Sequence, residues 1–109
     1  MDFKKVPFEQ NDKIELTDAE IAAAKRTYGD ISLIEVGGKK IYMHRPTRQI
    51  FDLAQTSAMK RPSLFEETIM TNCWLAGNKE ILDDVELFYG AARKVNEITK
   101  VAEAELKKL

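Results

Sequence analysis

The sequence predicts an α+β fold, and three patterns carry this prediction. A helical pattern with a defined start precedes residue 30, two strand-like segments flank Gly37-Gly38, and apolar stripes with helical spacing follow residue 47. Strands and helices that occupy separate parts of a chain are typical of this class. Because 109 residues fit one domain, we expect residues 17–109 to form a single α+β domain. Residues 1–16 show no sustained period, so we expect an extended or flexible N-terminal arm there.

The first helix and the hairpin have clear local signals. Thr17 and Glu20 have the spacing of a capping box, which marks a helix start, and Gly29 supplies a stop. Gly37-Gly38 tolerates the positive φ angles of a two-residue hairpin turn. The two strands of the hairpin are expected at residues 31–36 and 39–45. Two strands alone are marginally stable in water, so the hairpin must pack on helices, pair with the arm or pair with another chain.

A bundle of three to four helices is expected after the hairpin. Thr47 is a candidate N-cap, and Ser63 with Glu66 forms a second capping-box pattern. Gly90 either kinks the last helical stretch or divides it. The apolar stripes place helices at residues 48–59, 64–76, 79–89 and 91–109. The last of these carries an apolar seam nearly three heptads long, which could pack on its own bundle or on a second subunit.

Composition excludes several classes of protein. The 17 basic and 18 acidic residues leave a net charge of −1, which argues against a dedicated nucleic-acid binder. One Cys permits no internal disulfide and no cysteine-cluster metal site. No apolar run approaches the ~18 residues that span a membrane, and the first ten residues contain no signal-peptide h-region. We therefore expect a cytoplasmic protein without a membrane partner.

Catalytic and cofactor-binding patterns are missing. His44 and Cys73 could in principle be a base and a nucleophile, but no third orienting residue is indicated, and a buried Cys is usually inert. Neither metal-ligand spacing nor a phosphate-binding loop is present, since Gly37-Gly38 with Lys39 is better explained as a turn. We expect no enzyme activity, no metal and no cofactor.

Charge is unevenly distributed along the chain. Residues 39–48 contain several basic side chains and no acid, whereas residues 80–86 are acidic. The basic segment could be a ribbon for nucleic acid or a partner-binding strand edge. Opposite charge on the two segments also predicts complementary packing, within one subunit or between subunits.

The order of features resembles the small tail assembly chaperones of long-tailed bacteriophages. The resemblance lies in the segment 40–48, KIYMHRPTR, followed by a helix that contains Phe51 and Leu53, a central helix, an acidic short helix and a C-terminal helix. It implies a non-enzymatic protein of the host-cell cytoplasm that self-associates and binds the long, helical tape-measure protein during tail assembly.

On this hypothesis, six residues are candidate partner contacts, on the hairpin exit and on the last helix. They are Tyr42, Arg45, Arg48, Val95, Ile98 and Leu106. The last three are equally compatible with a core position. Two alternatives stay open, a small nucleic-acid-associated module that uses residues 39–48 and a permanent structural subunit of a tail or connector.

Overall fold

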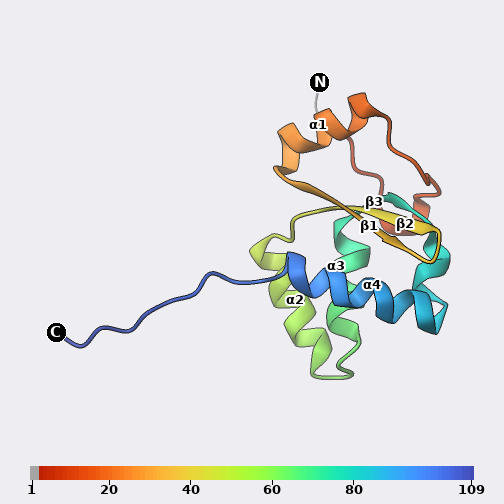
Figure 1. Cartoon of the computed structure of the whole chain (residues 1–109). Helices are drawn as coiled ribbons and strands as arrows, with labels where there is room; N and C mark the ends of the chain where they lie inside the picture. The colour runs from red at the N-terminus through yellow and green to blue at the C-terminus, as the bar shows by residue number, and fades with distance from the viewer. Residues whose placement is uncertain (1–2) are drawn as a thin grey trace.

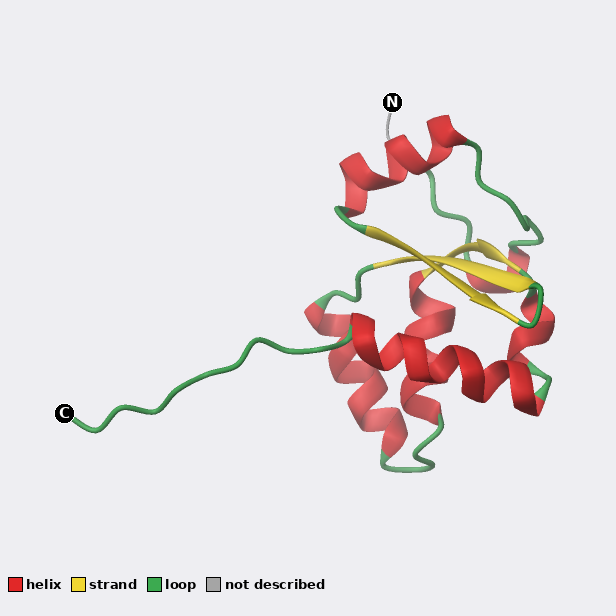
Figure 2. Cartoon of the chain, viewed as in Figure 1, coloured by secondary structure: helices red, strands yellow, loops and turns green. Residues whose placement is uncertain are grey.

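The computed structural model describes residues 3–109 as a three-stranded antiparallel sheet with helices on both faces (Figures 1 and 2). The strand order is β1-β2-β3. The α-helices are α1 (Asp18–Tyr28), α2 (Arg48–Ala58), α3 (Leu64–Cys73) and α4 (Val85–Ile98), and the strands are β1 (Ile31–Val36), β2 (Lys39–His44) and β3 (Trp74–Gly77). Two 3-10 turns, η1 (Phe8–Gln10) and η2 (Lys79–Leu82), complete the fold. The α+β prediction is confirmed.

The predicted hairpin is confirmed, and its turn has the expected geometry. Gly37 and Gly38 have φ angles of 54° and 77°, and Val36 pairs directly with Lys39 across the turn. Positive φ at both central residues is the signature of a type I′ turn, whose twist matches that of the two strands. Alternation along the strands then sends side chains to the two faces of the sheet.

Each face of the sheet has its own apolar cluster. On the face toward α2, α3 and α4, Ile34, Ile41 and Met43 pack with residues of these helices in the larger cluster. On the face toward α1, Tyr42 packs in a smaller cluster that also contains Ala24 of α1. The sheet is therefore the middle of three layers, with α1 on one side and the helical bundle on the other (Figure 1).

Apart from the 3-10 turn η1, residues 3–16 have no regular secondary structure, and part of this segment packs along β3. The backbone N–H of Gly77 donates to the carbonyl oxygen of Lys13 at 2.9 Å, and the buried Asn11 side chain donates to the Leu75 carbonyl oxygen at 2.9 Å. The Phe8 ring meets Trp74 edge-on, with 5.1 Å between ring centroids. Asn11 and Lys13 therefore cover the outer edge of β3.

The expected helix 64–76 is wrong at its C-terminal end. Helix α3 ends at Cys73, and Trp74–Gly77 form strand β3, which pairs with β2. A continuous apolar run buried on all sides has no period that separates a helix from a strand. Here the second side of β2 offers backbone hydrogen-bonding groups, so Trp74–Gly77 pair with β2 as a strand instead of continuing α3.

The predicted caps differ in outcome. Thr17 and Glu20 form the reciprocal capping box of α1, and Thr47 accepts from the Ile50 N–H at 3.2 Å, so both predictions are confirmed. The Ser63 cap is wrong, since Ser63 has helical angles (φ −65°, ψ −15°) and makes no side-chain cap bond. The preceding turn already supplies acceptors, because the Leu64 N–H donates to the Arg61 carbonyl oxygen at 2.9 Å.

The C-terminal helices also differ from the prediction. The expected helix 79–89 is interrupted: Lys79–Leu82 form η2, and residues 85–89 are the start of α4, which begins at Val85 and passes through Gly90 without a break. A Cβ at Gly90 would lie 2.8 Å from Val36 Cγ2, so glycine here permits close packing of α4 on β1. The expected helix 91–109 ends at Ile98, and residues 100–109 extend away from the body (Figure 1). Within residues 3–109, no helix has the length and apolar character required to cross a lipid bilayer.

Candidate protein-binding surface

The six predicted contact residues lie in different environments. Val95 is fully buried in the core, and Tyr42 is only 7% exposed, with its hydroxyl donating to Glu15 Oε2 at 3.2 Å. Arg48 is exposed at the start of α2, with its Nε atom 3.9 Å from Asp52. The side chains of Val95 and Tyr42 are therefore buried inside the protein, and neither is accessible to a partner.

Leu106 is exposed but does not lie on a helix. Its exposed fraction is 99%, and it belongs to residues 100–109, which have no regular secondary structure. The prediction of a helical seam through this residue is wrong for the isolated chain, because no neighbouring element covers the segment. A short helix without tertiary packing is marginal in water.

Arg45 and Ile98 are the two predicted residues that the fold brings together. Both line an open groove of about 550 Å³ between β1 and α4, called the β1–α4 groove below. Its walls are formed by Asp30, Ser32, Leu33, Ile34, Glu35, Arg45, Lys94, Glu97 and Ile98. In Figure 1, β1 lies between α1 and α4, which places the groove along the outer side of this strand.

The groove combines an apolar centre with charges of both signs. Leu33 is 47% exposed there. Lys94 pairs with Glu97 at 3.4 Å on α4, and Arg45 has no ion pair within residues 3–109. A surface with an exposed apolar residue, both charge signs and an open shape is suited to a protein partner.

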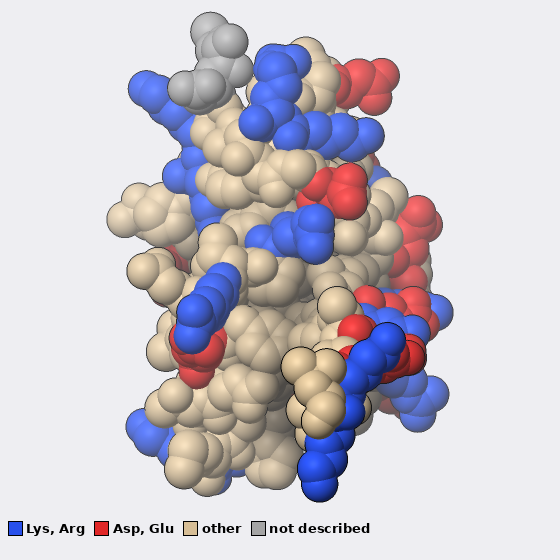
Figure 3. All heavy atoms as spheres, turned by 90° about the vertical axis from the view of Figure 1, so that its left-hand side faces the viewer, with Lys and Arg blue, Asp and Glu red and all other residues tan. Residues whose placement is uncertain are grey.

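The basic segment 39–48 does not form one basic surface. Lys39 pairs with Glu80 at 3.1 Å, and Lys40 pairs with Glu15. The first of these contacts confirms the predicted attraction between the basic hairpin and the acidic segment, and it lies within one chain. Figure 3 shows Lys and Arg at several separate places on one face of the molecule, with Asp and Glu among them. This arrangement does not favour a nucleic-acid interface.

A buried polar cluster joins the arm to the sheet, and the sequence did not reveal it. His44 is 2% exposed, and its Nδ1–H donates to the Arg45 carbonyl oxygen at 2.7 Å. Its Nε2 atom lies 2.8 Å from the Lys5 ammonium, which also donates to the Asn72 carbonyl oxygen. Tyr28 stacks on the imidazole, with 4.3 Å between ring centroids. The sequence around Lys5 has no periodicity, so it contains no pattern that predicts the contact between Lys5 and His44.

This cluster is poorly suited to catalysis. Burial lowers the pKa values of Lys5 and of His44. Burial raises the pKa of Cys73 to about 12, so the thiol is protonated at neutral pH. Since both His44 nitrogens are engaged, the imidazole has no free lone pair with which to activate a nucleophile.

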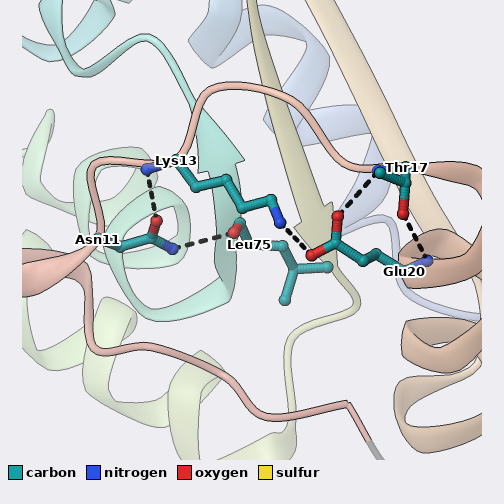
Figure 4. A network of polar contacts seen from close by, with 5 residues as sticks. All are labelled: Asn11, Lys13, Thr17, Glu20 and Leu75. Carbon is teal, nitrogen blue, oxygen red and sulfur yellow. Dashed lines mark hydrogen bonds and ion pairs between the residues drawn. The ribbon is translucent and has the colours of Figure 1, made fainter.

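A second, mostly apolar hollow of about 570 Å³ lies between the arm, α1 and β3. Figure 4 shows polar contacts at its border, where Lys13 pairs with Glu20 and the Glu20 carboxylate accepts from the Thr17 N–H at 3.0 Å. These are the contacts of a helix cap and a packed arm. They leave no unpartnered polar group directed into the hollow among the residues shown.

Neither a search for metal-binding clusters nor comparison with known proteins assigns a further site or function. No group of three or more His, Cys, Asp or Glu residues within 3–109 is arranged to hold a metal ion. The chain matches no family model, and comparison with curated proteins and with solved structures gives no significant match.

Proposed function

We propose that the chain is a non-enzymatic assembly chaperone of the phage-tail type. It binds a long helical protein of the tape-measure kind, acts in the host-cell cytoplasm and self-associates. The observation that carries the proposal is the C-terminal segment, residues 100–109, where a sequence with helical spacing has no packing partner among the residues that the structure describes.

The C-terminal segment has the composition of a helix. It contains no Gly or Pro, and it is built from Val, Ala, Glu, Leu and Lys, most of which are strong helix formers. Ile98, Ala102, Leu106 and Leu109 follow one another at intervals of four, four and three residues, which places them on one face of a helix.

Within residues 3–109, the same segment has nothing to pack on. Helix α4 is held to the body by Phe88, Ala91, Ala92 and Val95, all of which are buried. From Lys100 onward the side chains are exposed, with Val101 at 70% and Leu109 fully accessible. Because packing of an amphipathic face supplies most helix stability, an apolar stripe on another helical protein would allow α4 to continue through this segment. This is the helix-in-groove mode of recognition.

The proposal is tested by titrating the full chain with overlapping peptides of a long helical protein encoded beside its gene. We expect binding with a gain of helical circular dichroism. The double variant Leu106→Ser/Leu109→Ser should bind more than about tenfold more weakly, a loss of at least about 1.4 kcal/mol.

The matched control is Lys107→Ser/Lys108→Ser, which changes two neighbouring side chains of the same segment but leaves the apolar seam intact. We expect it to bind within about threefold of the unmodified chain, a difference under about 1 kcal/mol. Equal affinity of the apolar variant and the unmodified chain would refute the role of the segment. Presence of the chain in finished particles would identify a structural subunit instead.

A further inference from the structure

Within residues 3–109, one edge of the sheet is covered by hydrogen bonds from the N-terminal arm and the other edge is not. At the β3 edge, the Gly77 N–H donates to the Lys13 carbonyl oxygen and the Asn11 side chain donates to the Leu75 carbonyl oxygen, both at 2.9 Å. No corresponding bonds cover the outer side of β1 in the described part of the chain. An uncovered edge presents a row of backbone donors and acceptors to another strand.

The hairpin geometry identifies which groups of β1 face outward. A two-residue turn closes on a hydrogen-bonded pair, here Val36 and Lys39, and bonded and non-bonded pairs then alternate along the ladder. The pair Glu35–Lys40 is therefore of the non-bonded kind. Consistent with this, Lys40 exchanges two hydrogen bonds with Asn78 on the opposite side, at 3.0 and 2.9 Å.

The same alternation assigns the rest of the strand. The N–H and C=O groups of Ile31, Leu33 and Glu35 point to the open edge. Two of these residues, Glu35 and the half-exposed Leu33, line the β1–α4 groove. Arg45 and Lys94 bring positive charge to this groove, and acidic side chains bring negative charge. A patch with both signs can be complementary to itself across a two-fold axis, as an isologous interface requires.

We propose that a second copy of this chain occupies this edge, with two β1 strands paired antiparallel about a two-fold axis at Leu33. This register places Leu33 against its counterpart and Ile31 against Glu35 of the other copy. It is the antiparallel register that engages the outward groups of all three residues, and it sets no like charges directly opposite one another. The two three-stranded sheets become one continuous sheet.

The proposal deepens the self-association part of the proposed function and rests on it in that respect. Pairing uses the edge of β1, whereas the helical client is assigned to residues 100–109, and Ile98 lies where the β1–α4 groove and the apolar seam meet. The two can therefore be measured separately on the same variants.

The experiment is light scattering with size-exclusion chromatography on the full chain and on Leu33 variants. Leu33→Lys and Leu33→Asp each place like charges at the two-fold axis, so each alone is expected to be monomeric, with association weakened at least tenfold. A mixture of the two variants is expected to form a one-to-one heterodimer. Leu33→Val, which keeps the apolar contact, is expected to remain dimeric. Circular dichroism checks that each variant is folded.

Amide hydrogen exchange supplies a second measurement that depends on no variant. The Leu33 and Glu35 amides should be protected in concentrated solution and lose this protection on dilution, while the Ile34 amide stays protected by its bonds to β2. A monomeric unmodified chain at high concentration, a dimeric Leu33→Lys variant or a mixture that fails to associate would each overturn the pairing. A monomer that still binds the helical peptides would overturn this inference and the self-association part of the proposed function, but it would leave client binding standing. A β1-paired dimer that binds none of the peptides would support this inference and refute client binding.

Discussion

Gly77 lies at the end of β3, against the backbone of Lys40 and Ile41 in β2. Its φ angle is 154°, and a Cβ placed there would lie 2.5 Å from the Lys40 carbonyl oxygen and 2.9 Å from Ile41 Cα. Backbone atoms cannot move aside as a flexible side chain can, so a larger residue must separate the two strands. At the residue scale, glycine at this position permits the close approach of β3 to β2.

We expect Gly77→Ala to lower the free energy of unfolding by at least about 2 kcal/mol, through overpacking and an unfavourable backbone conformation. Urea unfolding at neutral pH measures the change. Gly38→Ala is the matched control, because its φ angle of 77° costs an alanine about 1–2 kcal/mol while a Cβ there meets nothing within 4 Å. A smaller loss at Gly77 than at Gly38 would contradict the steric explanation.

At the scale of elements, α3 and α4 show how helix starts are set. Asp84 caps α4, since its carboxylate accepts from the N–H groups of Glu86 and Leu87, both at 3.0 Å. Ser63 has the sequence pattern of a cap but makes no cap bond. The difference arises because the chain enters α3 through an already helical turn, in which the Leu64 N–H finds a backbone acceptor at Arg61.

Substitution Asp84→Ala should therefore destabilise the protein by about 1 kcal/mol, the usual value of a lost N-cap. Ser63→Ala should change the free energy of unfolding by less than about 0.5 kcal/mol, as for surface positions without special contacts. Asp83→Ala controls for the removal of a negative charge near the same helix end. Chemical denaturation of the three variants checks the order, and equal effects of Asp84→Ala and Asp83→Ala would show that charge, not capping, matters.

At the scale of the whole molecule, the Lys5–His44 contact ties three layers together. Lys5 comes from the arm, His44 from β2 and Tyr28 from α1, while Lys5 also donates to the carbonyl oxygen of Asn72 at the end of α3. Burial lowers the pKa of His44 below its ordinary value of 6.5, and the neighbouring Lys5 charge acts in the same direction. In the folded state, His44 therefore stays neutral at pH values where the unfolded chain takes up a proton.

Because the unfolded state then binds more protons, stability falls as pH decreases below about 6.5. At pH 5.5 the loss from this one group is at most about 1.4 kcal/mol. Urea unfolding at pH 7.5, 6.5 and 5.5 tests this, and His44→Gln should remove most of the slope in that range.

The control for this pH dependence is Glu15→Gln. The pKa of Glu15 is lowered from 4.5, first by its bond with Lys40, so its contribution is lost at more acidic pH, and the slope between pH 7.5 and 5.5 should stay unchanged. A flat stability profile of the unmodified chain over this range would contradict the neutral, buried His44.

The candidate surface was predictable only in part. Arg45 and Ile98 were predicted separately, one from the hairpin exit and one from a helical stripe, but their meeting in the β1–α4 groove depends on how α4 crosses the sheet. The stripe that contained Ile98 also contained Val95, which is fully buried. Spacing along a helix identifies an apolar face but does not say which residue of that face lies at the end of the covered surface.

Features that depend only on contacts within about four residues are predictable from the amino-acid sequence. These are the Thr17 capping box, the Thr47 cap and the hairpin turn at Gly37-Gly38. The residues that form each cap or turn lie within a few positions of one another, so the local sequence is sufficient to predict it. Tertiary structure decided that Trp74–Gly77 is a strand and that α4 ends at Ile98. Trp74–Gly77 form a strand because β2 has free backbone hydrogen-bonding groups along its second side. Helix α4 ends at Ile98 because no described element packs on the residues that follow it.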